Sequence, residues 1–292
     1  MLEPPVTVTM REIRRKPDWL KVRPPGSPEF NRVRAVLADL RLHSICQEAR
    51  CPNVAECFQS GTATFLILGN ICTRNCAYCN VRRGTPAPPD SGEPERIAAA
   101  VKTLGLSYAV ITSVTRDDLP DGGAEMFARC IHHLRRGVPG CRVEVLIPDF
   151  RGSRNALDAV LESGPDVINH NMEVVKPLFT QLRPRGDYET SIEIIRKIKA
   201  FHGKLVSKSG FMIGLGEEWS DILELLEDLA AAGCERITIG QYQQPNRDRC
   251  PVKKYYHPDE FEALKHIASH MGFRHVESGP LVRSSYHAAK AL

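Results

Sequence analysis

The sequence has no apolar run long enough to cross a membrane and no marked excess of charge of one sign. A membrane helix needs roughly 18 to 20 consecutive apolar residues. The opening residues 1–25 mix proline with arginine, lysine and glutamate instead of forming the apolar core of a secretion signal. The 39 basic and 35 acidic residues leave a net charge of only +4, which is too small and too dispersed for a nucleic-acid groove. We therefore expect a cytoplasmic protein that binds neither membranes nor nucleic acids.

Low-complexity linkers are also missing, so nothing separates a second domain from the first. Charged residues make up 25% and hydrophobic residues 42% of the 292 residues, which is the usual balance for a globular protein and argues against disorder or a fibrous repeat. A chain of this length can bury a full core.

Cysteine, by contrast, is abundant. Six of the ten cysteines fall between residues 46 and 79, in two tight groups of three. Without a signal for an oxidising compartment, this clustering favours metal ligation over disulfides. We expect the other four, Cys130, Cys141, Cys234 and Cys250, to be structural thiols.

From residue 63 onward, short apolar runs alternate with amphipathic helical patterns, which is typical of parallel βα units. The predicted strands are residues 63–69, 108–114, 142–147, 166–170, 205–213 and 236–241. The predicted helices are residues 94–104, 124–136, 153–162, 188–201, 220–232 and 258–270, with Ser220 as a candidate N-cap and Gly233 as a candidate helix end. Six such units predict an α/β fold, a partial (β/α)6 TIM-type barrel whose chemistry lies at the carboxyl ends of its strands.

The sharpest motif is C-x3-C-x2-C, formed by Cys72, Cys76 and Cys79 just after the first predicted strand. Three thiolates can hold three corners of a cubane iron–sulfur cluster and leave the fourth iron open for chemistry. A zinc knuckle is the alternative, but structural zinc wants four closed ligands and no fourth ligand lies nearby at zinc-finger spacing.

A second group, Cys46, Cys51 and Cys57, has the spacing C-x4-C-x5-C and lies just before the barrel. By ligand count it again offers three corners of a cubane. The alternative is three buried or incidental thiols, since cysteine is common in protein cores.

The first motif resembles that of the radical S-adenosylmethionine (SAM) superfamily, and the two motifs in this order resemble the lipoyl synthase family. The resemblance runs from about Cys46 to the last residues. It includes residues 112–124 (TSVTRDDLPDGGA), 169–173 (NHNME), 209–217 (SGFMIGLGE), 238–242 (TIGQY) and 278–286 (SGPLVRSSY).

This resemblance implies roles for individual residues. Ser285, in the terminal Arg-Ser-Ser-Tyr element, would be the fourth ligand of an auxiliary cluster. The resemblance further implies SAM contacts from Tyr78, Asn171, Glu173, Gly214 and Glu217. It places the acidic loop of Asp117, Asp118 and Asp121 at the rim of the site, where a solvated turn or a cation site is the alternative. Arg183 and Arg185 could pair with the SAM carboxylate, although they could equally be solvated.

The resemblance divides the chain into an N-terminal extension with the auxiliary cysteines (1–60), a radical SAM barrel (61–272) and a C-terminal cluster-ligating segment that closes the site (273–292). Within the extension, residues 31–45 carry apolar residues at helical spacing, which predicts a helix.

The implied activity is insertion of sulfur at C6 and C8 of a protein-bound octanoyl-lysine, with two 4Fe-4S clusters and SAM as cofactors. A deoxyadenosyl radical would remove hydrogen, and the auxiliary cluster would donate sulfur. The implied partners are octanoylated lipoyl-carrier domains (the glycine cleavage H protein and 2-oxoacid dehydrogenase acyltransferases), an electron donor such as ferredoxin or flavodoxin, and an iron–sulfur carrier protein.

The alternatives to this function are another radical SAM enzyme with an auxiliary cluster and a protein that holds two clusters without catalysis. Radical SAM enzymes such as biotin synthase or a methylthiotransferase lack the pairing of C-x4-C-x5-C with the terminal residues 283–286. An electron-transfer or scaffold protein would be expected to supply four cysteines per cluster, whereas each group here supplies three.

Overall fold

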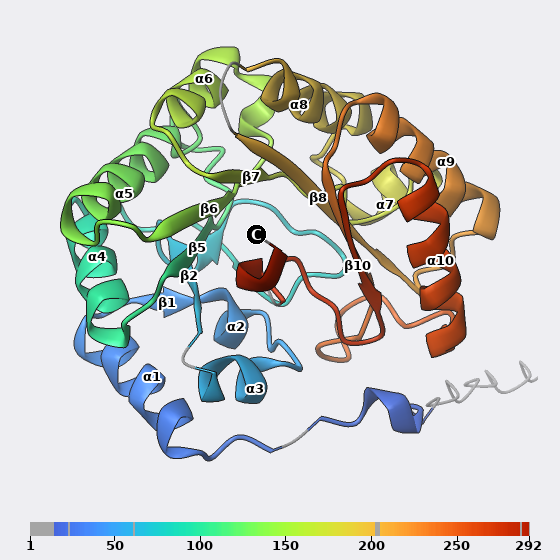
Figure 1. Cartoon of the computed structure of the whole chain (residues 1–292), viewed down its shortest axis with the longest axis horizontal. Coiled ribbons are helices and arrows are strands. Elements are labelled where there is room, and N and C mark those ends of the chain that lie inside the picture. Colours follow the sequence, from blue (N-terminus) through green and yellow to red (C-terminus); the bar gives the residue numbers. More distant parts are fainter. Residues whose placement is uncertain (1–14, 23, 61, 202–204, 287, 292) are drawn as a thin grey trace, which may run out of the picture.

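The computed structural model describes residues 15–22, 24–60, 62–201, 205–286 and 288–291. Eight strands form one curved sheet in the order β1-β2-β5-β6-β7-β8-β9-β10. Strand β1 is antiparallel to β2, and every other neighbouring pair is parallel. The edge strands β1 and β10 do not pair, so the sheet is an open barrel with its helices outside (Figure 1). The predicted partial barrel is confirmed.

The strands are short, and most residues of the large sheet are buried. Strand β5 is covered on both faces: Ala109 and Ile111 belong to the main core with the helices, while Tyr108 and Val110 contact Ala288 near the chain's end. The bounds are β1 (His43–Ser44), β2 (Thr64–Ile67), β5 (Tyr108–Ser113), β6 (Arg142–Leu146), β7 (Val167–Asn169), β8 (Val206–Ile213), β9 (Arg236–Gln241) and β10 (His275–Gly279), with a separate small pair, β3 (Ile71–Cys72) and β4 (Arg82–Arg83).

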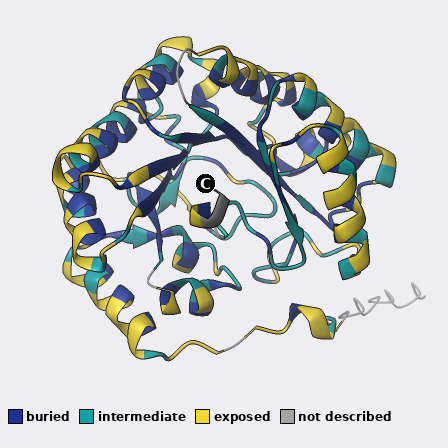
Figure 2. Ribbon diagram, viewed as in Figure 1, coloured by how far each residue is buried: buried dark blue, intermediate teal, exposed yellow. Residues whose placement is uncertain are grey.

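Amphipathic helices cover the outer face of the sheet and leave their far sides exposed (Figure 2). In α5, for example, Phe127, Cys130, Ile131 and Leu134 are buried at spacings of three and four residues. The helices are α1 (Pro28–Asp39), α2 (Ile45–Glu48), α3 (Val54–Gln59), α4 (Glu93–Leu104), α5 (Ala124–Gly137), α6 (Arg154–Glu162), α7 (Phe179–Leu182), α8 (Tyr188–Ala200), α9 (Trp219–Ala231) and α10 (Pro258–His270), with 3-10 turns η1 (Asp18–Leu20), η2 (Phe150–Gly152), η3 (Lys176–Leu178) and η4 (Ala288–Ala291).

The six predicted strands are all present, with ends that differ by at most two residues. Strand β10 was not predicted and adds a seventh parallel strand. The helix predicted for residues 31–45 is α1, which begins earlier because Ser27 accepts a hydrogen bond from Phe30 N and Pro28 occupies the first turn. It also ends earlier, because Arg41 has a positive φ of 51° that turns the chain into β1.

The start of α9 corrects one prediction and its end confirms another. Ser220 is not the N-cap. Glu218 holds that position, and its side chain and that of Asp221 form a reciprocal capping box. Gly233 does end the helix, with a φ of 81° just after the C-cap Ala232.

Three segments fill the open side of the barrel. Helices α2 and α3 lie between β1 and β10, and the C-terminal segment folds back to the centre of the barrel (Figure 1). The segment that joins η1 to α1 passes outside α3 toward α10. There the Trp19 and His257 rings contact edge to face, with centroids 5.0 Å apart. Residues 1–14 of the predicted extension lie outside the described residues. None of the described helices is both long enough and apolar enough to cross a bilayer.

Candidate active site

The first cysteine group sits on a loop that follows β2. Cys72 ends the short strand β3, and Cys76 and Cys79 follow in a turn closed by the Cys79 N to Cys76 O hydrogen bond of 3.2 Å. Burial raises the pKa of Cys79 to about 12, and it raises the pKa of Cys76 against the opposing effects of a Tyr78 hydrogen bond and the Arg183 charge. These thiols therefore stay protonated unless a positively charged group binds them.

The second cysteine group lies on α2, α3 and the turn between them. Ser44 caps α2 by accepting from Cys46 N at 3.1 Å, and Cys51 N donates to Cys46 O at 3.0 Å. Burial, together with the nearby Cys46 and Cys51, raises the pKa of Cys57 to about 12. The three thiols predicted to act together are thus close enough to influence one another.

Asn80 joins the two groups. It follows Cys79, and its Nδ2 donates to Glu48 O at 2.7 Å, at the end of the helix that carries Cys46. Asn70 Nδ2 also donates to Glu48 Oε1 at 3.2 Å. Both cysteine groups consequently lie at the same end of the barrel.

The C-terminal segment packs against the second group. Asn53 Nδ2 donates to Leu281 O at 2.5 Å, and Tyr286 OH donates to Glu56 Oε1 at 2.9 Å. The turn that contains Ser285 therefore lies beside the helix that carries Cys57.

Arg283 stands between the two groups. Burial lowers the pKa of Arg283, and the neighbouring Cys51 and Glu173 oppose that effect. Glu173 is in turn a neighbour of Cys76 and Cys79. The Arg283 guanidinium therefore interacts with Cys51 of the second cysteine group and with Glu173, which lies beside the first group.

Asn171 and Glu173 follow β7 and lie against the C-terminal segment. Asn171 Nδ2 donates to Glu173 Oε1 at 3.0 Å and to Ser284 Oγ at 2.5 Å. Burial raises the pKa of Glu173, while Arg183 and Asn171 partly offset the rise. Arg183 is buried and donates to Asn171 O at 2.9 Å, so it is not the solvated arginine weighed as an alternative.

The turn after β8 is organised by Glu217. Its carboxylate accepts from the backbone N–H groups of Gly214, Leu215 and Gly216 at 2.6, 2.9 and 3.1 Å. Gly214 has a φ of 105°, and a Cβ there would lie 2.1 Å from Gln241 Nε2. Glu217 thus shapes this turn, and only glycine fits at residue 214.

The acidic loop after β5 is engaged by the protein itself. Asp118 pairs with the buried Arg116 at 2.8 Å, and Asp121 accepts from Gly123 N and Glu125 N at the start of α5. Asp117 accepts two hydrogen bonds from Arg74, both of 2.8 Å. Each of the three carboxylates therefore has a structural partner.

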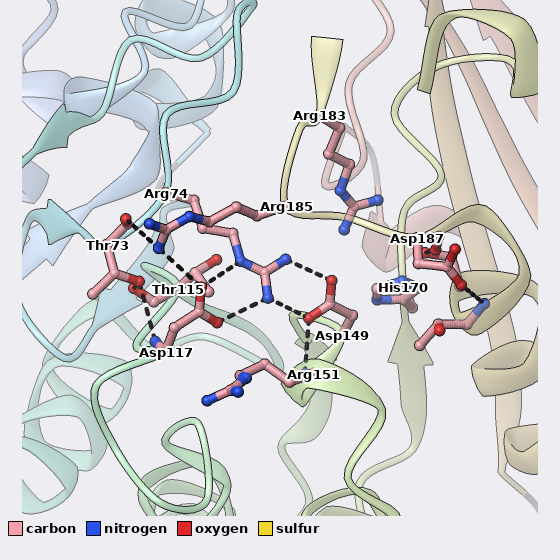
Figure 3. A network of polar contacts seen from close by, with 12 residues as sticks. Thr73, Arg74, Thr115, Asp117, Asp149, Arg151, His170, Arg183, Arg185 and Asp187 are labelled. Carbon is pink, nitrogen blue, oxygen red and sulfur yellow. Dashed lines mark hydrogen bonds and ion pairs between the residues drawn. The ribbon is translucent and has the colours of Figure 1, made fainter. Parts of the chain in front are cut away.

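Arg74 and Asp149 are the residues that the sequence analysis missed. Arg74, inside the first cysteine loop, also donates to Asp149 at 2.5 and 2.6 Å and so lies between two carboxylates (Figure 3). Burial opposes its charge, but the hydrogen bonds that Arg74 donates to both carboxylates outweigh burial and raise the pKa of Arg74. A signal was available, because Asp149 follows the carboxyl end of a predicted strand.

Comparisons with known proteins identify the relatives of this chain. A family model described as "Radical SAM superfamily" matches residues 66–240, and one described as "N-terminal domain of lipoyl synthase of Radical_SAM family" matches residues 3–51. The lipoyl synthase of Pseudoalteromonas translucida is 51% identical over 281 residues, covering 95% of this chain and 87% of the relative. That of Caldanaerobacter subterraneus subsp. tengcongensis is 50% identical over 278 residues, covering 95% of this chain and 97% of the relative.

The chain belongs to the lipoyl synthase family. Solved structures support the fold. Methylornithine synthase (PylB) has a TM-score of 0.53 at 12% identity and covers 85% of this chain and 81% of its own. Streptococcus suis SuiB bound to precursor peptide SuiA has a TM-score of 0.57 at 12% identity and covers 85% of this chain and 52% of its own.

Membership of the lipoyl synthase family makes this chain a radical SAM enzyme with SAM and 4Fe-4S clusters as cofactors. The donor sets fit, because each group offers three soft thiol ligands. Among the described residues, no three His, Cys, Asp or Glu side chains are placed so that they could hold a single metal ion. A cubane spreads its ligands over separate irons, so its thiolates need not converge on one point.

Buried polar atoms fit a bound small molecule as well. Asn169 Oδ1 and Nδ2 and Asn171 Oδ1 are buried and have no hydrogen-bond partner within the described part of the protein. Buried amides are costly without partners, and SAM carries amino, carboxylate and hydroxyl groups that can supply them.

Proposed function

We propose that this member of the lipoyl synthase family inserts sulfur at C6 and C8 of an octanoyl chain bound to a lysine of a carrier protein. The observation that carries the proposal is the position of residues 281–286, which contact α3 of the second cysteine group and Asn171 beside the first. A substrate held at this point reaches both groups, which sulfur transfer to a reactive carbon requires.

The two cysteine groups have separate tasks in this proposal. Cys72, Cys76 and Cys79 would hold the cluster that SAM binds, and Cys46, Cys51, Cys57 and Ser285 would hold the auxiliary cluster. When bound, the first cluster supplies the electron that cleaves SAM and the second supplies the sulfur. A serine oxygen is harder and more easily exchanged than a thiolate, which suits a ligand that must be released.

The remaining residues bind and orient SAM. Glu173 and Asn171 offer oxygens to the SAM amino group or ribose, and Arg183, a buried cation beside Cys76, offers charge to its carboxylate. Tyr78 flanks the adenine, and the Gly214–Glu217 turn presents backbone to it. The C-terminal segment covers the site and excludes dioxygen and external hydrogen donors, which would otherwise quench a carbon radical.

The proposed partners follow from this chemistry. The substrates are octanoylated lipoyl-carrier domains, namely the glycine cleavage H protein and 2-oxoacid dehydrogenase acyltransferases. Ferredoxin or flavodoxin would supply electrons, and an iron–sulfur carrier protein would restore the auxiliary cluster that gives up sulfur. The proposed compartment is the cytoplasm, whose reducing conditions keep the six clustered cysteines available as ligands.

The deciding experiment is anaerobic incubation of cluster-reconstituted protein with SAM, dithionite and an octanoyl-lysyl peptide, followed by mass spectrometry. In the expected product sulfur replaces one hydrogen at each of C6 and C8, so the reduced dithiol is heavier than the substrate by two sulfur atoms, and two 5′-deoxyadenosine molecules are released per product. An unchanged peptide alongside released 5′-deoxyadenosine would overturn the proposed substrate.

Two variants separate the roles of the clusters. Cys76→Ala is expected to abolish SAM cleavage, whereas Cys51→Ala is expected to retain it and lose sulfur transfer. Each variant should lose about half of the bound iron, because each group holds one cluster of about four irons. Retained SAM cleavage in Cys76→Ala would contradict the assignment of the first group.

A further inference from the structure

The side chain of Arg74 lies inside the protein although it belongs to an irregular loop. It is the middle residue of the three between Cys72 and Cys76, and only 5% of its side chain is exposed. Burying a guanidinium on a loop is unusual, because a charge is costly away from water unless it is fully paired.

Arg74 pairs with two carboxylates, which lie in the loops that follow two different strands. Its Nε and Nη2 donate to Asp117 Oδ2 and Oδ1, in the loop after β5, and its Nη1 and Nη2 donate to Asp149 Oδ2 and Oδ1, in the loop after β6 (Figure 3). Both pairs are bidentate, the geometry that fixes a guanidinium most firmly in position and direction.

Both carboxylates are themselves held in place. Asp149 Oδ1 accepts from Arg151 N at 3.0 Å, in a turn where Phe150 and Arg151 have positive φ values of 45° and 54°. Asp117 N donates to Thr73 Oγ1 at 3.1 Å, which ties the loop after β5 to the residue before Arg74. We call the Arg74 side chain together with Asp117 and Asp149 the clamp. Both of its carboxylates are therefore fixed to the barrel.

The clamp acts on the cysteines through the backbone of Arg74. Its N–H donates to Cys72 Sγ at 3.4 Å, and three residues separate the flanking cysteines, so a shift at residue 74 moves both sulfur atoms. Hydrogen bonds to cluster sulfur atoms and nearby charges are the main controls on the reduction potential of an iron–sulfur cluster.

We propose that Arg74 is a positioning residue for the first cluster: held by Asp117 and Asp149, it fixes the cysteine loop in one geometry and sets the electrostatic surroundings of the bound cluster. The inference rests on the proposed role of Cys72, Cys76 and Cys79. Arg74 touches neither SAM nor the reacting atoms in this assignment.

The test compares Arg74→Lys with the matched control Arg116→Lys in reconstituted full-length protein. Arg116 is equally buried, with 2% of its side chain exposed, and pairs with Asp118, but it makes no hydrogen bond to the cysteine loop. The readouts are the electron paramagnetic resonance signal of the reduced protein that changes on adding SAM, and its midpoint potential.

Arg74→Lys keeps the charge but loses the two bidentate pairs. We expect a broadened or split SAM-sensitive signal and SAM cleavage reduced about tenfold, a size usual for loss of a supporting contact at a metal site. Arg116→Lys should leave the signal unchanged. An Arg74→Lys protein with the wild-type signal, potential and SAM cleavage would overturn the inference.

A second variant covers the case in which Arg74→Lys does not fold. Asp149→Asn keeps the shape of the side chain and removes one negative charge, so the midpoint potential should rise, while Asp118→Asn should leave it unchanged. Equal potentials in both variants would also overturn the inference. A Cys72→Ala control that keeps the SAM-sensitive signal would instead overturn the proposed cluster site itself, so the two failures are distinguishable.

Discussion

Two adjacent serines in the C-terminal turn have different neighbours. Ser284 Oγ accepts a hydrogen bond from Asn171, beside the first cysteine group, and Ser285 is the proposed ligand of the auxiliary cluster. Because the residues are chemically identical and adjacent, each serves as the control for the other.

We expect Ser285→Ala to leave SAM cleavage within about twofold and to lower sulfur transfer about a hundredfold, the upper range for loss of a contact at a metal site. Ser284→Ala should cost about 1 kcal/mol of stability through one lost hydrogen bond and keep sulfur transfer. Quantifying 5′-deoxyadenosine and the sulfur-containing peptide from the same reaction checks both. A Ser284→Ala protein with the larger loss of sulfur transfer would move the ligand to Ser284.

His170 predicts how stability depends on pH. Burial and, to a smaller extent, the Arg183 charge lower the pKa of His170 from 6.5 to about 4, and the ring pairs with Ile147 O at 3.0 Å. The unfolded chain binds a proton at higher pH than the folded one, so stability falls as pH drops from 6.5 toward 4. Between pH 6.5 and about pH 5 the loss should be about 1.5 kcal/mol.

The measurement is urea unfolding at both pH values for the wild type and His170→Gln. The substitution keeps an N–H donor and removes the titrating group, so the pH dependence should shrink by about 1.5 kcal/mol. An unchanged pH dependence would show that His170 does not titrate in this range.

At the scale of elements, the C-terminal segment lies directly on strand β9. A Cβ at Gly240 would lie only 2.2 Å from Val282 O, so glycine alone allows this close approach. We expect Gly240→Ala to displace residues 281–286, cost about 1 to 3 kcal/mol, and lower sulfur transfer more than SAM cleavage. Hydrogen exchange of that segment and assays of both activities measure the effect.

Gly137→Ala is the matched control, because its Cβ would meet Ala98 Cβ at an ordinary 3.5 Å. It should leave exchange of the C-terminal segment unchanged. Equal exchange in Gly240→Ala and wild type would mean that the segment tolerates the methyl group.

The elements that sequence alone predicts are those with one strong periodic signal. Strands buried on both faces have continuous apolar runs, but the edge strand β10 reads His-Val-Glu-Ser-Gly and only Val276 is fully buried. Its pairing with β9 comes from tertiary packing, which no local pattern contains. Ser220 failed as a cap for a related reason: Glu218 and Asp221 form a reciprocal pair that outcompetes a lone hydroxyl.

The candidate site divides in the same way. The two groups of cysteines are predictable from spacing, because residues close together in sequence stay close together on a loop, and their assignment as cluster ligands stays a prediction. The Arg74–Asp149 pair spans 75 residues and the Asn80–Glu48 hydrogen bond spans 32, so these contacts emerge only from the fold, although the position of Asp149 after a predicted strand already made it a candidate site residue.

For the molecule as a whole, a buried ion pair ties three strands together inside the barrel. Lys208 Nζ on β8 donates to Glu144 Oε1 on β6 at 2.8 Å, and Tyr108 OH on β5 donates to Glu144 Oε2 at 2.6 Å. Lys208→Met should lower the free energy of unfolding by about 3 to 5 kcal/mol, because Glu144 is left buried without its cation.

Denaturant unfolding of the apoprotein measures this loss, and Lys208→Met with Glu144→Gln should recover most of it. Lys21→Met is the control, since Lys21 pairs with Asp18 at 2.7 Å with both side chains largely exposed, and should cost no more than about 1 kcal/mol. A Lys208→Met loss as small as that of Lys21→Met would show that the pair is not essential to the barrel.

The open barrel also has a consequence for the order in which the protein matures. Cys46, Cys51 and Cys57 precede the parallel strands of the barrel in the chain, and the segment that packs against them, residues 281–286, follows those strands. The ribosome therefore makes the whole barrel after the second cysteine group and before residues 281–286, which cover this group. Under the proposed assignment, loading of the auxiliary cluster therefore follows the synthesis of residues 281–286, and a nascent chain that stalls in the barrel exposes these thiols to oxygen and to the wrong metals.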